Sequence, residues 1–266
     1  MSRIFISADI EGVCGIADWK ETELADPQSA YFRAQMTREV AAACEAAEAA
    51  GATEILVKDA HSTGRNLDPS ALPESVKIMR AWARNPLVMM AGLDASFDAA
   101  LLIGYHSGAG SDGNPLAHTM NGENIRVLVN GEEASECLIN TYTAASLGVP
   151  VAVVSGDRQL CERVTALNPN IATVAVNEGL GNAAISIHPK LAVARIRAAV
   201  TRALQGDLSA CRVALPARFE LAIDFRQHFL AYRGSFYPGA KQTGPRTVAF
   251  ACADWMDALR FLFFVL

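Results

Sequence analysis

The first strand-like stretch of the sequence reads Ile4-Phe5-Ile6-Ser7-Ala8-Asp9-Ile10-Glu11-Gly12. An apolar run ends there in two acids, and a spacing of two residues puts both carboxylates on one face if the chain stays extended. Two like charges at one strand end repel each other unless a cation lies between them, and a metal ion is the usual cation in such a place. For this motif alone, two solvated carboxylates on a loop remain the simpler interpretation.

The same pattern recurs at the ends of two later strands. Asp59 and His61 follow the apolar residues 55–57, and His106 follows the apolar residues 101–105. In open α/β sheets, ligands bind outside the carboxyl ends of the strands, so three strand ends deliver acids and imidazoles to one rim. A set of imidazoles and carboxylates without a thiolate suits catalytic Zn²⁺, with Mn²⁺ and Co²⁺ as competitors.

Strand-like and helix-like segments alternate along most of the chain. The predicted strands are 3–8, 54–58, 76–79, 99–104, 150–154 and 173–176, and the predicted helices are 29–50, 135–147, 158–167 and 189–204. Continuous apolar strands separated by helices are typical of a largely parallel sheet covered on both faces. The fold class is therefore α/β, with three α/β/α layers.

The pattern of predicted helices and strands changes from about residue 189 onward. A helix is followed there by an alternating strand at 219–225, a loop, a strand at 247–252 that would pair with it, and a helix from Trp255. This order indicates a smaller α+β lobe. We therefore expect a metal-binding catalytic domain over 1–188 and a smaller lobe over 189–266, continuous or interrupted. A hairpin is also expected over 126–133, with its turn at Asn130-Gly131.

Composition excludes several classes of function. The chain has 266 residues, 51% of them hydrophobic, and a formal net charge of -5 without any basic cluster. We therefore expect no nucleic-acid partner and no membrane partner. No signal peptide and no spanning segment are recognisable, and the six cysteines form no CxxC pair, which favours a cytoplasmic protein with reduced thiols. Cys14, three residues after Glu11, is a candidate for a further ligand, although a buried thiol is the plainer interpretation.

Two more groups of residues are candidates for chemistry. The stretch 107–118 is rich in Gly, Ser and Asn, which predicts a mobile surface loop that ends at His118. Such a loop can bring a titratable imidazole over a metal centre, or it can simply carry a solvated histidine. Glu132, Glu133 and Glu136 lie close to the start of a predicted helix, where acids favour the helix dipole, and composition does not choose among the three.

Together these residues resemble the metal-dependent D-aminopeptidase family (peptidase family M55), whose members are often labelled dipeptide-transport proteins. The resemblance covers most of the chain and rests on Asp9-Ile10-Glu11-Gly12 with Gly15, Lys58-Asp59-Ala60-His61-Ser62, Gly104-Tyr105-His106, His118-Thr119-Met120, Gly131-Glu132 through Ser135-Glu136, and Pro238-Gly239 with Thr243-Gly244. The order and the spacing of these segments agree with the family. The tracts 108–117 and 226–237 differ from it, which bears on substrate preference more than on the metal site.

The resemblance implies a centre of two zinc ions per chain. Asp9 matches the carboxylate that bridges the two ions, and Glu11 and His61 match further ligands of one ion. His106 and Glu136 match the ligands of the other ion, so the resemblance selects Glu136 from the three glutamates. His118 matches the catalytic histidine.

The resemblance also implies a homo-oligomer, because similar proteins form rings of ten subunits that enclose their active sites. The apolar run 261–266 fits this expectation, since a helix that is apolar almost all round must be covered by the protein's own smaller lobe or by a neighbouring subunit.

We therefore expect a cytoplasmic, zinc-dependent aminopeptidase that removes an N-terminal residue, of D configuration, from short peptides. His118 would exchange a proton or stabilise an oxyanion, and Asp59 would orient a ligand histidine. One rival is a dinuclear amidase or phosphatase, although only Lys58 and Arg65 offer charge for a phosphate near the acids. The other rival is a dipeptide-binding protein, which in the periplasm would need an export signal.

Overall fold

The computed structural model describes residues 2–266 and contains two sheets. The larger sheet has seven strands in the order β3-β2-β1-β4-β7-β8-β9, and all neighbours are parallel except the β8-β9 hairpin at one edge. Its strands are β1 (Ser2–Ala8), β2 (Ala52–Asp59), β3 (Val76–Met79), β4 (Ala99–Tyr105), β7 (Val151–Asp157), β8 (Ala172–Leu180) and β9 (Ala183–Ser186). The predicted strands are thus confirmed, and β9 is an addition to them.

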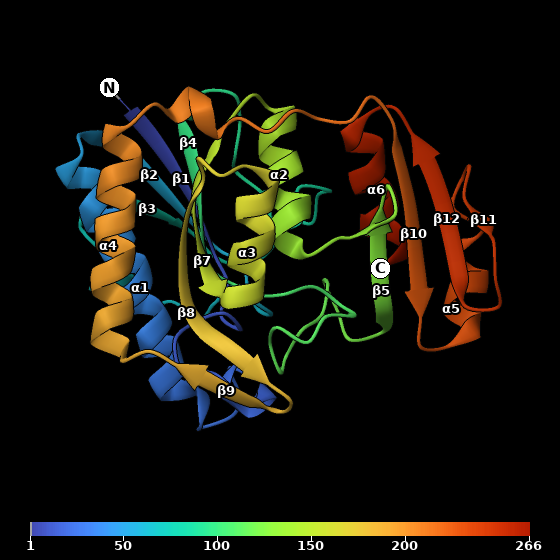
Figure 1. The fold of residues 1–266 in the computed structure, drawn as a ribbon, viewed down its shortest axis with the longest axis horizontal. Helices are drawn as coiled ribbons and strands as arrows, with labels where there is room; N and C mark the ends of the chain where they lie inside the picture. The colour runs from blue at the N-terminus through green and yellow to red at the C-terminus, as the bar shows by residue number, and fades with distance from the viewer. Residues whose placement is uncertain (1) are drawn as a thin grey trace.

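Helices cover both faces of the larger sheet (Figure 1). Ile4 and Ile6 of β1 belong to the core under α1 (Ser29–Ala49) and α4 (Pro189–Gln205). Phe5 points the other way, into the core under α2 (Glu136–Ser146) and α3 (Arg158–Leu167). Successive side chains of a strand alternate between faces, so a central strand must be apolar throughout to fill both cores. The predicted three-layer α/β/α fold is therefore confirmed.

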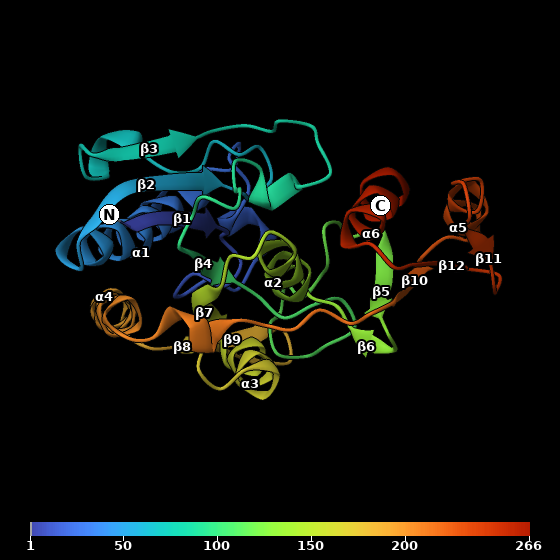
Figure 2. The same cartoon turned by 90° about the horizontal axis from the view of Figure 1, so that it is seen from above.

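A second, antiparallel sheet stands beside the first (Figure 2). Its order is β11-β12-β10-β5-β6, and the predicted pairing of 219–225 with 247–252 is present. Its strands are β5 (Asn124–Val129), β6 (Glu132–Glu133), β10 (Phe219–Phe225), β11 (Lys241–Gln242) and β12 (Thr247–Cys252), and its helices are α5 (His228–Gly234) and α6 (Trp255–Val265). The predicted hairpin turn forms between β5 and β6, with left-handed φ angles of 53° at Asn130 and 83° at Gly131.

The position of α4 differs from the prediction, which assigned this helix to the smaller lobe. It packs beside α1 on the larger sheet because Ile196 and Val200 of its apolar face belong to the core of that sheet. The second sheet also takes β5 and β6 from the middle of the chain. We therefore propose, in place of a division between 188 and 189, a discontinuous smaller lobe of 124–133 and 219–266.

The two lobes meet at α2, which lies between the larger sheet and α6 (Figure 1). Trp255, the first residue of α6, donates a hydrogen bond from Nε1 to Thr143 Oγ1 of α2 at 3.0 Å and packs against Tyr142. Most of the apolar run 261–266 is covered by this lobe, but Phe264 keeps 68% of its surface exposed. Among residues 2–266, no helix combines the length and the apolar character needed to cross a bilayer.

Candidate metal centre

The carboxyl ends of β1, β2 and β4 lie at one edge of the larger sheet because the three strands are parallel and adjacent. The loop after β1 is held tightly against the end of β4. Gly12 donates its N–H to Gly104 O at 2.9 Å, and a Cβ atom at Gly12 would lie 1.7 Å from Tyr105 O. Only glycine permits this approach, which turns the acids of the loop toward β2 and β4.

One cluster of side chains forms between β1 and β2. His61 Nδ1 lies 3.3 Å from Asp9 Oδ1 and 3.1 Å from Glu11 Oε2. The other ring nitrogen of His61, Nε2, lies 3.2 Å from the backbone carbonyl of Thr22. A carbonyl can only accept a hydrogen bond, so Nε2 carries a proton and Nδ1 is left as a ligand atom that faces two carboxylates.

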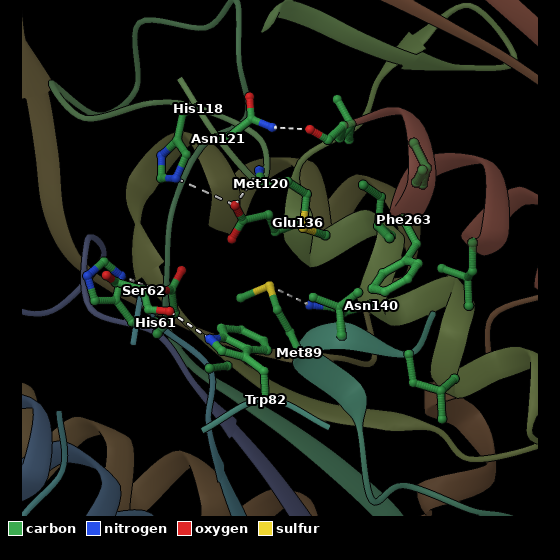
Figure 3. Close-up of a pocket in the computed structure, with 18 of the residues that line it drawn as sticks. His61, Ser62, Trp82, Met89, His118, Met120, Asn121, Glu136, Asn140 and Phe263 are labelled. Atoms are coloured by element: carbon green, nitrogen blue, oxygen red, sulfur yellow. Dashed lines mark hydrogen bonds and ion pairs between the residues drawn. The ribbon is translucent and has the colours of Figure 1, made fainter. Parts of the chain in front are cut away.

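A second cluster forms where β4, the following loop and the start of α2 meet. His106 Nε2 lies 3.6 Å from Glu136 Oε2, and His118 Nε2 lies 3.6 Å from Glu136 Oε1, as Figure 3 shows for the latter pair. The two imidazoles are stacked, with 4.4 Å between ring centroids. Each donates Nδ1–H to a backbone carbonyl at 2.9 Å, His106 to Ser107 and His118 to Leu116, so both Nε2 atoms face the site as bases.

Asp9 connects the two clusters. Its Oδ1 faces His61 in the first cluster, and its Oδ2 lies 3.5 Å from His106 Nε2 in the second. One carboxylate thus offers one oxygen to each group of ligands. Within residues 2–266, ligand atoms gather closely enough to hold a metal ion in just two groups, Asp9 with Glu11 and His61, and Glu136 with His106 and His118.

The chemistry of the donors fits metal ions. Asp9 Oδ2, both oxygens of Glu11 and His106 Nε2 are buried without a hydrogen-bond partner in the described part of the chain. Burial, and then the charge of Glu11, raise the pKa of Asp9 well above its ordinary value. Burial disfavours the charged form of His106, but Glu136 and the other acids outweigh it and raise its pKa to about 10. Buried, unpartnered acids are costly without a cation, and divalent ions would satisfy these atoms.

Within residues 2–266, Asp59 forms no hydrogen bond or ion pair with a histidine ring. Its carboxylate accepts hydrogen bonds from the backbone N–H of Asn66 at 2.6 Å and of Leu67 at 2.8 Å, and from Asn66 Nδ2 at 2.9 Å. Asn66 Nδ2 also donates to the backbone carbonyl of His61 at 2.7 Å. Asp59 therefore acts on His61 through the loop that carries it, because the buried carboxylate is fully occupied by that loop.

The loop 107–118 is packed and not a mobile surface segment as predicted. Ser107 donates from both its N–H and its Oγ to the buried Asp157 carboxylate at 2.6 Å, and Asn114 Nδ2 donates to Glu11 O at 3.1 Å. Gly179 of β8 donates to Gly113 O at 3.0 Å. Glycine, serine and asparagine are enriched here because backbone segments approach closely. The packed loop therefore holds His118 in a fixed position.

The remaining candidates lie outside both clusters. Glu133 forms an ion pair with Arg163 at 2.6 Å, and Glu132 is exposed on β6. Cys14 is buried, donates Sγ–H to Ile187 O at 3.0 Å, and has its pKa raised to about 12 by burial. Of the three glutamates, only Glu136 reaches the site, because it is the first residue of α2 and its Oε1 accepts the N–H of Met120 at 2.7 Å.

A cavity of about 480 Å³ opens over the clusters, which is the size of a small-molecule site. Figure 3 shows Phe263 and Met89 facing it on the side away from His118. Sequence reasoning missed this wall, which consists largely of apolar side chains from 86–89 and from α6. Its apolar members are Pro86, Leu87, Val88, Met89, Leu259, Leu262, Phe263 and Leu266, which directly follows α6, and Arg84 is its charged member.

Backbone strain gathers around the cavity. Among residues 2–266, six residues other than glycine have a left-handed φ, and four of them line the cavity: Ser62, Arg84, Val88 and Met120. Left-handed φ angles are uncommon for such residues and persist where surrounding contacts enforce them, often at functional sites. The strain therefore points to the cavity as the working part of the molecule.

Comparisons with known proteins agree with this geometry. A family model described as D-aminopeptidase, of peptidase family M55, matches residues 2–264. The chain is 30% identical over 260 residues to the D-aminopeptidase of Bacillus subtilis (strain 168), covering 96% of this chain and 93% of that protein. The structure of the Zn-dependent D-aminopeptidase DppA from Bacillus subtilis, described as a self-compartmentalizing protease, superposes with a TM-score of 0.90 at 28% identity, covering 99% of this chain and 96% of that one. The chain therefore belongs to the D-aminopeptidase family, peptidase family M55.

Proposed function

We propose that this protein is a zinc-dependent aminopeptidase that removes N-terminal D-amino acids from short peptides with a pair of metal ions. The position of Asp9 carries the proposal, because its two oxygens face two separate groups of ligand atoms. The Zn-dependent D-aminopeptidase with the same fold supports the choice of metal and of substrate class. The preference for D residues rests on the relatives alone.

Five residues would hold the metal ions. Asp9, Glu11 and His61 would bind one ion, and Asp9 would share the other with His106 and Glu136. Paired divalent ions polarise a carbonyl group and lower the pKa of water, which is the chemistry that peptide hydrolysis needs. The protein's contribution is to fix the imidazoles through the backbone carbonyls of Thr22 and Ser107.

His118 is the residue we propose for proton transfer. Its Nδ1–H is held by Leu116 O, so Nε2 is the basic atom and points to the site beside Glu136. Trp19 packs against the ring at 5.1 Å between centroids, which restricts its rotation together with the stacked His106. Nε2 would accept a proton from the attacking water and return it to the leaving amine, or donate a hydrogen bond to the developing oxyanion.

The cavity supports a peptide substrate over a phosphate ester. Lys58, one of the two cations near the acids in sequence, is fully buried, and its Nζ donates to the backbone carbonyls of Asp59 and Ala81. Arg65 is exposed and does not line the cavity. Glu23 on the cavity lining is an acid outside both clusters, so it is available to pair with the ammonium group of a substrate N-terminus.

We also propose that the chain assembles into a homo-oligomer, a ring of ten subunits, that encloses its active sites. The relative described as self-compartmentalizing supports assembly. Large apolar side chains that stay exposed in the single chain supply surface for it: Phe229 at 51%, Tyr232 at 59%, Phe236 at 71% and Phe264 at 68%. Such a ring would admit short peptides and exclude folded proteins, so selection by size would come from assembly.

One experiment tests the proposed function directly. Matched D- and L-aminoacyl dipeptides and amides are assayed with the purified protein, first after chelation and then after zinc is restored. The proposal predicts cleavage of D-aminoacyl peptides that disappears with chelation and returns with zinc. Hydrolysis that survives complete removal of metal, or failure to cleave any peptide of the panel with zinc bound, would refute it.

A further inference from the structure

The segment 80–88, called here the arm, is held in an unusual shape next to the metal clusters. Ala81, Arg84 and Val88 have left-handed φ angles of 62°, 56° and 44°. Side chains other than glycine rarely adopt this region, so a turn that uses it three times within eight residues needs contacts that enforce it. At Ala81 and Trp82, those contacts come from the end of β2 and from the loop that follows it.

Lys58 and the residues after His61 supply them. Lys58 is fully buried, donates from Nζ to Ala81 O at 2.9 Å, and lies 4.2 Å over the ring of Trp82. Trp82 Nε1 donates to Ser62 O at 2.7 Å, as Figure 3 shows, and Ala81 donates to Gly64 O at 2.7 Å. The arm is therefore fixed to the same short loop that carries His61.

Arg84 follows Trp82 by two residues, so their Cα atoms lie at most about 7 Å apart. Arg84 lines the cavity and is exposed to water, whereas Arg80, at the base of the arm, is exposed but does not line it. Arg84 is the single lysine or arginine of the lining that the structure describes. No ion pair within residues 2–266 includes it, although its neighbours in the lining include four acids.

A guanidinium group that is unpaired, backed by a rigid turn and open to the cavity is suited to bind a carboxylate. Its planar fork can donate two parallel hydrogen bonds, which the amine of a lysine cannot reproduce. Three of the four acids, Asp9, Glu11 and Glu136, belong to the groups of ligand atoms, where the reacting peptide bond would be, and Glu23 is the acid proposed for the substrate amine. A short peptide in zwitterionic form has a positive amine at one end and a negative carboxylate at the other. The guanidinium group of Arg84 is complementary to the carboxylate.

We propose that Arg84 binds the C-terminal carboxylate of the substrate, so that the enzyme selects short peptides with a free carboxyl end over amides and over longer chains. The inference rests on the proposed aminopeptidase function. It assigns Arg84 to specificity and not to bond cleavage, because Arg84 lies on the wall and outside both groups of ligand atoms. The substrate class is then a di- or tripeptide with both termini free.

The test compares each D-aminoacyl dipeptide with its C-terminal amide, using the full-length, zinc-loaded protein. The wild-type protein should have a higher kcat/KM for the free acid, by about tenfold or more, the scale of a hydrogen bond to a charged group. In Arg84→Met this ratio should fall close to one, and the change should appear mainly in KM. Arg84→Lys should recover only part of the ratio, because lysine lacks the fork.

Arg80→Met is the matched control, since it removes an exposed arginine four residues away without touching the cavity, and it should keep the wild-type ratio. A ratio in Arg84→Met equal to that of the wild type would overturn the inference while leaving the proposed function intact. The inference would also be overturned if Arg84→Met lowered kcat and raised KM equally for the acid and the amide, because that pattern indicates a structural role. If the wild type cleaves neither substrate, the proposed function itself has failed.

Discussion

The two sides of the cavity are constructed differently. On the side of the strand ends, Asp9, Glu11 and His106 are almost completely buried, and the histidines are oriented by backbone carbonyls. On the wall, Arg84 is exposed, Phe263 is half-buried, and the contributing segments come from the arm and from α6 of the other lobe. This contrast indicates that the strand ends fix the chemistry, whereas the choice of peptide depends on segments that can vary independently.

The largest expected effects separate ligands from the proton-transfer residue on the chemical side. His61→Ala and His106→Ala should lose zinc together with activity, because each removes a buried ligand atom. His118→Ala should keep its zinc and lose on the order of 10²-fold or more in kcat. Zinc is measured by elemental analysis of the purified variants, beside steady-state kinetics.

His188→Asn is the control for these histidine variants, because His188 caps the N-terminus of α4 and asparagine can cap it equally well. It should retain both zinc and rate. Loss of zinc from His118→Ala to the same extent as from His106→Ala would move His118 into the ligand set and remove its proposed role in proton transfer.

A second prediction concerns Glu39, which supports the chemical side from behind. Its Oε1 accepts the N–H of Cys14 at 3.1 Å and a bond from Gln35 at 2.9 Å, whereas Oε2 is buried without a partner. Burial raises the pKa of this carboxyl from 4.5 to about 7. The pKa of Glu39 is thus higher in the folded protein, about 7, than in the unfolded chain, 4.5. Its contribution to the free energy of unfolding is therefore complete below pH 4.5 and is lost as the pH rises through about 7.

Because glutamine stays neutral, the free energy of unfolding of Glu39→Gln should depend less on pH than that of the wild type. The free energy of unfolding of Glu39→Gln relative to the wild type should rise between pH 5 and pH 8, by up to about 3 kcal/mol. Denaturant titrations of both proteins across this range measure the difference. A constant difference at every pH would show that Glu39 does not titrate in the folded protein.

The smallest effect is expected on the wall. Phe263→Ala should raise KM by a few-fold for peptides with large apolar side chains, because it removes apolar surface that faces the cavity. Glycyl and alanyl peptides provide the comparison within the same assay, and their KM should change less. Equal changes for small and large side chains would indicate that Phe263 supports the fold of α6 and does not contact the substrate.

The contrast between the two sides also explains what the sequence could predict. Asp9 and His106 directly follow β1 and β4, and His61 lies two residues after β2. Parallel strands bring such positions to one edge whatever the details of the fold. Glu136 could not be chosen from composition. Glu133 is excluded from the site by its ion pair with Arg163, which is distant in sequence. That choice needed the resemblance to the family.

The wall could not be predicted because it depends on contacts between distant segments. The arm has no periodic pattern, and its shape depends on Lys58, whose fully buried side chain is unusual for lysine. The joining of β5 to β10 spans about ninety residues of sequence, so local patterns could not show that β5 belongs to the second sheet. The packing of the loop 107–118 could not be predicted for the same reason, since Asp157 of β7 holds its first residue, Ser107.

The zinc stoichiometry of Asp9→Ala tests whether the Asp9 carboxylate joins two metal sites. The wild type should bind about two zinc ions per chain, and Glu11→Gln, which affects one group of ligands, should retain about one. Asp9→Ala should fall below Glu11→Gln and lose all activity, because both sites lose a ligand. Asp9→Ala that retains zinc at the wild-type level would contradict the bridging role and the two-metal account that depends on it.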